Sequence, residues 1–331
     1  MEEELQLSSD RPRKQGKPET APVAQGIKPG MSNEEIVNVL IGMPEEQLIP
    51  WEMCELPSGG RFYQDGAGNH WPDGIVQVRA MTQTAEKVLA TSRLAESGQA
   101  IDYLLKECCR FPAGFDPVDL LISDRTFLLY YIRGITHGND YEFAVECPND
   151  DCGKKSIHEY DLNELAGTIR KPDPTLGDEP FKVVLPYASK VAGKEVWVQV
   201  RFLRGIDIQN LVSRRKAKAR TIVRPGQSTN PFQRRLQQQQ QQNQVTIDQS
   251  LTEIMEKNVV SVMGVRDPQV LAAFIGKMHA TDSATIREWL RENTPGIDTT
   301  VNITCPSCGN NFTVELPISE TFFRPQIKRG S

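Results

Sequence analysis

The sequence has 331 residues, a net charge of −5 and 38% hydrophobic residues, which fits a soluble protein with room for two modest domains or for one domain with an insertion. No apolar run approaches the roughly eighteen residues of a membrane-spanning helix, and the acidic start Met1-Glu2-Glu3-Glu4 lacks the apolar core of a secretory signal. Seven cysteines are an odd number, which argues against a disulfide framework and favours a reducing compartment.

The first part of the chain, residues 1–45, is predicted to be a mostly disordered arm. Residues 1 to about 30 are rich in Pro, Lys and Gln and poor in aliphatic side chains. A short amphipathic helix is indicated over 32–41, with Ser32 as its N-cap. Its apolar face contains Ile36, Val39 and Leu40. Such a helix either packs on its own domain or reaches a neighbouring subunit, and the sequence leaves both open.

Residues 46–165 are predicted to form an α+β domain. Residues 54–80 have the pattern of a strand, a turn and a second strand. Helices are expected next, over 82–94, over 101–109, and from Asp116-Pro117 and Ser123-Asp124 onward. The adjacent Cys108 and Cys109 lie on an apolar helix face, which favours a place in the core over a metal or redox role.

No set of residues in the chain predicts catalysis. Asp119, Asp124 and Arg125 are close enough in sequence to suggest a catalytic cluster, but capping and surface pairing explain them more simply. The sequence has no nucleophile elbow, no phosphate loop and no paired carboxylates with a plausible site. We therefore expect a protein that is not an enzyme.

Two pairs of cysteines carry the strongest chemical signal. Cys147 and Cys152 form one pair, Cys305 and Cys308 the other, and each pair lies between strand-like segments, with Pro after its first Cys and Gly after its second. The second pair has the CxxC spacing typical of a zinc knuckle, and the first has a wider gap. Together they predict one structural Zn²⁺ site, since four cysteine ligands leave no open position for a catalytic water. The alternatives are reduced surface thiols or a disulfide within each pair.

His158 lies close to the first pair in sequence. We expect it to be a solvent-facing strand residue, although it would be a substitute ligand if the wider spacing kept Cys147 and Cys152 from binding together.

Residues 166–297, between the two pairs, are predicted to be an inserted α/β segment whose base the metal holds. Its expected elements are a hairpin of 181–186 with 195–203, a helix from Asp207, a helical pattern from Ile247 to Val259, a helix from Asp267-Pro268, and a helix capped by Thr281, Asp282 or Ser283. Between the second and third of these lies a basic, Gln-rich low-complexity loop over 214–245.

The last segment, 298–331, contains the second cysteine pair between two strands, followed by a C-terminal tail in which Phe322-Phe323 either docks on a partner or caps the ribbon. The predicted fold class is therefore α+β: a helical block plus small β-hairpins, joined by a split four-Cys zinc ribbon, with a disordered N-terminal tail and a Gln-rich loop.

Several short motifs occur in an order that resembles the T4-type bacteriophage baseplate protein family, usually described as a baseplate hub subunit. The motifs are Leu56-Pro57-Ser58-Gly59-Gly60-Arg61-Phe62-Tyr63, Met81-Thr82, Asp119-Leu120-Leu121 with Asp124, Ile132-Arg133, Leu185-Pro186, Pro295-Gly296-Ile297-Asp298, the second cysteine pair, Leu316-Pro317 and Phe322-Phe323-Arg324-Pro325. Each is weak alone, and their order over about 50–325 carries the resemblance.

The resemblance implies a structural or assembly component in the hub region of a contractile-tailed phage baseplate. Its partners would be other baseplate and tail proteins, with no small-molecule substrate and no membrane span, and it would be made in the host cytoplasm and reside in the virion tail. The alternative is a zinc-ribbon nucleic-acid-binding protein. The basic run 214–220 supports this alternative, and the acidic net charge argues against it.

Overall fold

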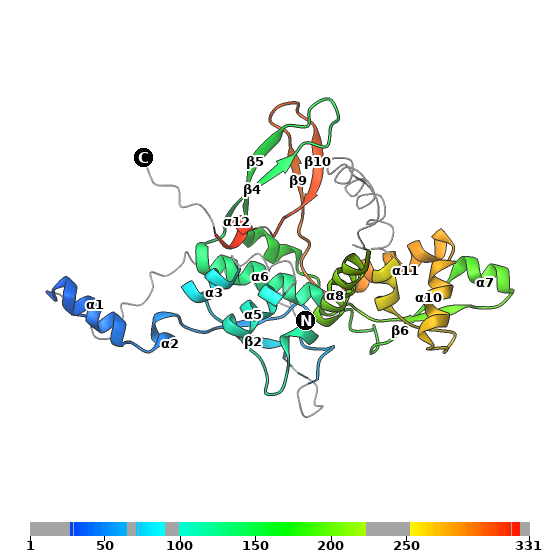
Figure 1. Cartoon of the computed structure of the whole chain (residues 1–331), viewed down its shortest axis with the longest axis horizontal. Coiled ribbons are helices and arrows are strands. Elements are labelled where there is room, and N and C mark those ends of the chain that lie inside the picture. The colour runs from blue at the N-terminus through cyan, green and yellow to red at the C-terminus, as the bar shows by residue number, and fades with distance from the viewer. Residues whose placement is uncertain are drawn as a thin grey trace, which may run out of the picture. The chain divides into compact units, whose positions relative to one another are not determined.

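The computed structural model describes residues 27–28, 30–64, 71, 73–89, 99–222, 252–318 and 320–324 (Figure 1). They belong to two compact units, Met1–Pro50 and Trp51–Ser331. The tail expected to be disordered, most of the glutamine-rich loop and the end of the helix expected over 82–94 lie outside the described residues. Among the helices described, none combines the length and the apolar character of a membrane span.

The first unit contains two helices, α1 (Asn33–Gly42) and α2 (Glu45–Leu48). The N-cap predicted for α1 is confirmed. The Ser32 hydroxyl accepts a hydrogen bond from the backbone N–H of Glu35 (3.3 Å), and the Glu35 carboxylate accepts one from the N–H of Ser32 (2.8 Å). This reciprocal pair satisfies two donors at the start of the helix. No residue of α1 is buried.

The second unit begins with a three-stranded antiparallel sheet in the order β1 (Glu52–Glu55), β2 (Ile75–Val78) and β3 (Cys109–Arg110). The predicted pattern of strand, turn and strand is confirmed. The first strand, however, ends at Glu55, and the motif over 56–63 forms turns. Gly59 and Gly60 have φ values of 61° and 74°, a left-handed conformation that favours glycine in the turns after the strand.

Helical segments border this sheet, and they form the predicted helical block. They are α3 (Gln83–Leu89), α5 (Gln99–Cys108), the 3₁₀ turn η1 (Pro117–Asp119) and α6 (Ile122–His137). Leu128 and Ile132 of α6 belong to the same buried apolar cluster as Val76 of β2. Cys108 and Cys109 are also buried there, and burial raises the pKa of Cys108 to about 12, so both have the core position expected of them.

A second antiparallel sheet has the order β6 (Phe181–Val184), β7 (Trp197–Val200) and β8 (Val259–Val262). The predicted hairpin is present as β6 and β7, but a helix, α7 (Pro186–Ala192), lies between them. A helix was expected from Ile247 to Val259. Residues 252–258 are helical, but the prediction is wrong at Val259, which begins β8. The β-branched residues of β8 pair with β7, and this distant partner decides their conformation.

Three longer helices accompany the second sheet: α8 (Gly205–Ile222), α10 (Pro268–Gly276) and α11 (Ala280–Asn293). The cap predicted for α10 is confirmed, because the Asp267 carboxylate accepts hydrogen bonds from the N–H groups at the helix start (2.9 and 3.0 Å). The cap predicted for α11 is wrong. His279 is its N-cap, and Asp282 is buried and serves another helix.

Candidate metal centre

The first cysteine pair lies at the end of a β-hairpin. Strands β4 (Asp140–Glu146) and β5 (Lys155–Asp161) pair in antiparallel register along their whole length, as the alternating pattern of β4 predicts. In the connecting turn, the carbonyl oxygen of Asn149 accepts hydrogen bonds from the N–H groups of Cys152 (2.8 Å) and Gly153 (3.0 Å). This compact turn accommodates the wider spacing of the pair.

The second pair lies in a turn of the same design between β9 (Thr300–Thr304) and β10 (Asn311–Glu315). The N–H of Cys305 donates to the carbonyl of Asn310 (2.9 Å), just as that of Cys147 donates to Lys154 (3.0 Å). Each turn ends in a glycine with positive φ, Gly153 in the first and Gly309 in the second. The two turns therefore present their sulfur atoms in equivalent ways.

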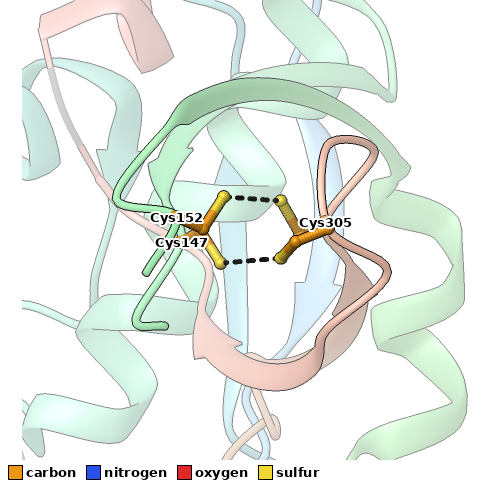
Figure 2. Close-up of side chains that lie close together, drawn as sticks. Cys147, Cys152 and Cys305 are labelled. Atoms are coloured by element: carbon orange, nitrogen blue, oxygen red, sulfur yellow. Dashed lines mark hydrogen bonds between the residues drawn. The ribbon is translucent and has the colours of Figure 1, made fainter. Parts of the chain in front are cut away.

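The four sulfur atoms converge on one point (Figure 2). All lie within 4.8 Å of one another, and two separations between the pairs are 3.7 Å, from Cys147 to Cys308, and 3.9 Å, from Cys152 to Cys305. A disulfide needs about 2.05 Å, so the alternative of a disulfide within each pair does not describe this structure. A tetrahedral ion with bonds of about 2.3 Å separates its sulfur ligands by about 3.8 Å, which fits the observed spacing.

Backbone groups around the second pair favour a thiolate. The N–H groups of Ser307 and Cys308 hydrogen-bond the sulfur of Cys305 and lower its pKa to about 7. A backbone hydrogen bond from Asn310 also lowers the pKa of Cys308. Desolvation and the other three thiols outweigh it and raise the pKa of Cys308 to about 12. A metal cation competes with the proton for a thiol of this kind, since only the thiolate binds the ion.

His158 is not part of the cluster of four cysteines. It lies on β5, half-buried, with its Nε2 atom 2.8 Å from the Ser156 hydroxyl. The cysteines of the first pair approach the second pair without a substitute ligand. His158 is a strand residue as expected, but it packs against Phe143 and is half-buried, not solvent-facing.

A buried polar network near α6 was missed by the sequence interpretation. Asp124 is completely buried, and Arg125 is 7% exposed, so the expectation of surface pairing is wrong for both. The Arg125 guanidinium donates to Asp102 (2.6 Å) and to the carbonyl of Pro117 (2.9 Å). Asp124 has separate partners, Ser58 and Tyr63, which belong to the motif over 56–63.

The C-terminal aromatic pair caps the ribbon, which was one of its two expected roles. Phe322 and Phe323 lie on α12 (Glu320–Phe323) and are both buried. The Phe322 ring packs edge-to-face against Tyr130 of α6 and Tyr141 of β4, with ring centroids 4.9 and 5.0 Å apart. The pair therefore joins the β4–β5 hairpin to the helical block.

The basic run 214–220 is helical and continues α8 to Ile222, so the expectation of a loop beginning at residue 214 is wrong at its start. Arg215 pairs with Glu253 at 3.1 Å, and the side chains from 216 to 222 are outside the described part of the chain. No finding supports the alternative of nucleic-acid binding.

Comparison with known proteins places the chain in a family. No curated protein and no solved structure matches it. A family model described as T4 bacteriophage base plate protein matches residues 50–324. This match covers most of the chain, begins after α1 and α2, and includes all four clustered cysteines and every motif of the resemblance except Pro325. The chain therefore belongs to the T4 bacteriophage base plate protein family and has a structural role in the baseplate of the phage tail.

Proposed function

We propose that the chain works in the hub region of a contractile-tailed phage baseplate, where it acts by protein–protein contacts and not by catalysis. The family match over residues 50–324 is the observation that carries this proposal. In the proposal the chain is made and assembled in the host cytoplasm, its partners are other baseplate and tail proteins, and it is either a lasting part of the hub or a factor that builds it.

The four clustered cysteines are, in this proposal, the ligands of one structural Zn²⁺. Cys147, Cys152, Cys305 and Cys308 supply a complete sulfur set at separations that suit a tetrahedral ion. Sulfur-only tetrahedral sites hold zinc or iron, and zinc is the ion typical of two knuckles joined in a ribbon. Such an ion would hold the two hairpins together and take no part in a reaction.

The domain boundaries proposed from the sequence also have a structural argument. Residues 1–45 form the arm, 46–165 the α+β domain, 166–297 an inserted segment and 298–331 the second knuckle with its tail. Arg170 and Gly296, near the two ends of the insertion, exchange backbone hydrogen bonds of 2.7 and 3.0 Å. This pairing supports an insertion that leaves and rejoins the domain at one place, and β5 and β9 separate that place from the cysteine pairs along the chain.

This architecture suits a part that keeps its shape while neighbours bind to it. Cys152 and Cys305 are 153 residues apart in sequence. A link across so long a loop removes much conformational freedom from the unfolded chain and so stabilises the folded one.

Cross-linking mass spectrometry of purified virions and of tail intermediates from infected cells tests the proposed function. We expect peptides of the chain in at least one of these particles, cross-linked to proteins at the centre of the baseplate. Cross-links confined to peripheral baseplate proteins would contradict the hub position. Absence of the chain from virions and from every intermediate would contradict the proposed role itself.

A further inference from the structure

Helices α7 and α10 form an apolar groove beside the second sheet. Its volume is about 630 Å³, and its lining includes Tyr187, Val191, Ala192, Ala273, Phe274 and Met278. A carboxylate of α11 fixes the start of α7, one of the two helices of the groove. The Asp282 carboxylate of α11 accepts hydrogen bonds from the N–H groups of Tyr187 (2.8 Å) and Ala188 (3.0 Å), and so caps α7.

The surface of the groove is open to a partner. Val191 is 71% exposed and Tyr187 43% exposed, which is unusual for neighbouring large apolar side chains in a groove. The one carboxylate in the lining, Asp282, is buried and occupied by α7. Lys277 is the lysine in the lining and makes the rim of the groove basic on the side of α10; Lys190 lies on α7 but is not part of the lining.

Helix α1 has the complementary properties. Its apolar face is unpartnered within its unit, with Val37 52% exposed, Leu40 36% and Ile41 77%. The segment 31–50 contains four glutamates and neither lysine nor arginine. A ten-residue helix is marginal on its own, even with the capping box at Ser32, and gains most from burying its apolar face. Amphipathic helices commonly bind in apolar grooves.

We infer that the groove between α7 and α10 binds α1 of a second copy of this chain. Apolar side chains of α1 would fill the groove, while its acidic residues face the basic rim. The next unit starts at Trp51, whose ring is held by Arg110 (4.1 Å) at the first sheet, whereas the groove adjoins the second sheet. A second copy can present α1 to the groove whatever the placement of the two units within one chain. The inference concerns self-association and does not depend on the position of the chain in the baseplate.

Sedimentation velocity of the full chain over a range of concentrations tests the inference with matched variants. Leu40→Glu on the apolar face of α1 and Ala273→Glu in the groove are each expected to weaken self-association by about tenfold or more. Asn38→Glu, on the opposite face of α1, and Ala272→Glu, the neighbouring position outside the groove lining, should leave it unchanged. All four substitutions add one negative charge at an exposed position. A difference in self-association between the variants therefore does not come from net charge or from a buried charge that disturbs folding.

A mixture of the two defective chains distinguishes exchange between copies from other arrangements. The Leu40→Glu chain retains an intact groove and the Ala273→Glu chain an intact helix, so the mixture should form a one-to-one complex at concentrations at which either chain alone is monomeric. A wild-type chain that is monomeric at every concentration would overturn the inference. This is the result to be expected if α1 occupied the groove of its own chain. Association that survives both Leu40→Glu and Ala273→Glu, or a mixture that fails to associate, would overturn it too.

Discussion

Asp124 links two segments of the second unit through hydrogen bonds that no solvent competes for. Its carboxylate accepts from the backbone N–H of Ser58 (3.1 Å) and from the Tyr63 hydroxyl (2.5 Å), and that hydroxyl in turn accepts from the N–H of Leu121 (2.9 Å). Burial raises the pKa of Asp124 to about 6 in spite of these hydrogen bonds. Both hydrogen-bond donors to this carboxylate come from the motif over 56–63, so the motif and Asp124 form one structural unit.

This raised pKa predicts how Asp124→Asn changes the pH dependence of stability. The folded state binds the proton more tightly than the unfolded chain, whose carboxyl has an ordinary pKa of 3.8, so the wild type loses stability from this group as the pH rises through about 6. The asparagine variant stays neutral. The free energy of unfolding of the variant, relative to that of the wild type, should therefore increase between about pH 4 and about pH 7, by up to about 3 kcal/mol.

Urea unfolding at several pH values measures this difference directly. A gap between the two proteins that is constant over that interval, or that moves in favour of the wild type, would contradict the raised pKa.

Gly59 and Gly60 allow a second comparison at the residue scale. Both have positive φ, so alanine is strained at either position. A Cβ at Gly59 would meet nothing within 4 Å, whereas one at Gly60 would overlap the carbonyl oxygen of Trp71 and the backbone of Gly74. We expect Gly59→Ala to cost about 1 kcal/mol and Gly60→Ala about 2 kcal/mol more, measured by thermal or urea unfolding. Equal losses would show that the close approach is absent.

At the scale of the element, local chemistry in the sequence was sufficient wherever a cap or a turn decides the structure. Ser32 with Glu35, and Asp267 with Pro268, start helices as expected. The turns of the two cysteine pairs are equally local, because Pro and Gly at fixed positions shape them.

Elements that depend on distant partners were predicted less well. Val259 begins a strand because β7 lies beside it, and no pattern within 252–262 contains that information. Asp282 looked like the cap of its own helix, but it caps α7, about ninety-five residues earlier in the chain. Helix α7 itself had local signals, since Pro186 occupies its first turn and Gly193 its C-cap in the left-handed conformation, and these signals were interpreted as a hairpin turn.

The short helix α12 gives a prediction at this scale. Phe322 is completely buried between Tyr130 and Tyr141, so Phe322→Ala should lower the free energy of unfolding by about 3 to 5 kcal/mol. Phe312 on β10 is only half-buried, and Phe312→Ala serves as the matched control with less than half of that loss. Chemical denaturation of both variants provides the measurement. Similar losses would mean that α12 does not hold the hairpin to the helical block.

At the scale of the whole molecule, the cysteine cluster decides how distant parts of the chain are joined. The sequence predicted which four sulfurs would meet, because each pair has the turn residues and flanking strands of a knuckle. The sequence could not predict the backbone hydrogen bonds between Arg170 and Gly296, because every residue has such groups and no side chain marks these two. Both connections bring the end of the chain back to the first domain.

The zinc content of the purified full-length chain tests the central claim most directly. Elemental analysis should find about one Zn²⁺ per chain, and Cys308→Ser, at an exposed position where packing is not disturbed, should lose most of it. Cys54→Ser is the matched control, because Cys54 is buried far from the cluster in sequence and belongs to β1. It should retain the metal. A wild-type chain that carries no metal, and whose thermal unfolding a chelator does not change, would contradict the claim that the four thiolates join the two hairpins through an ion.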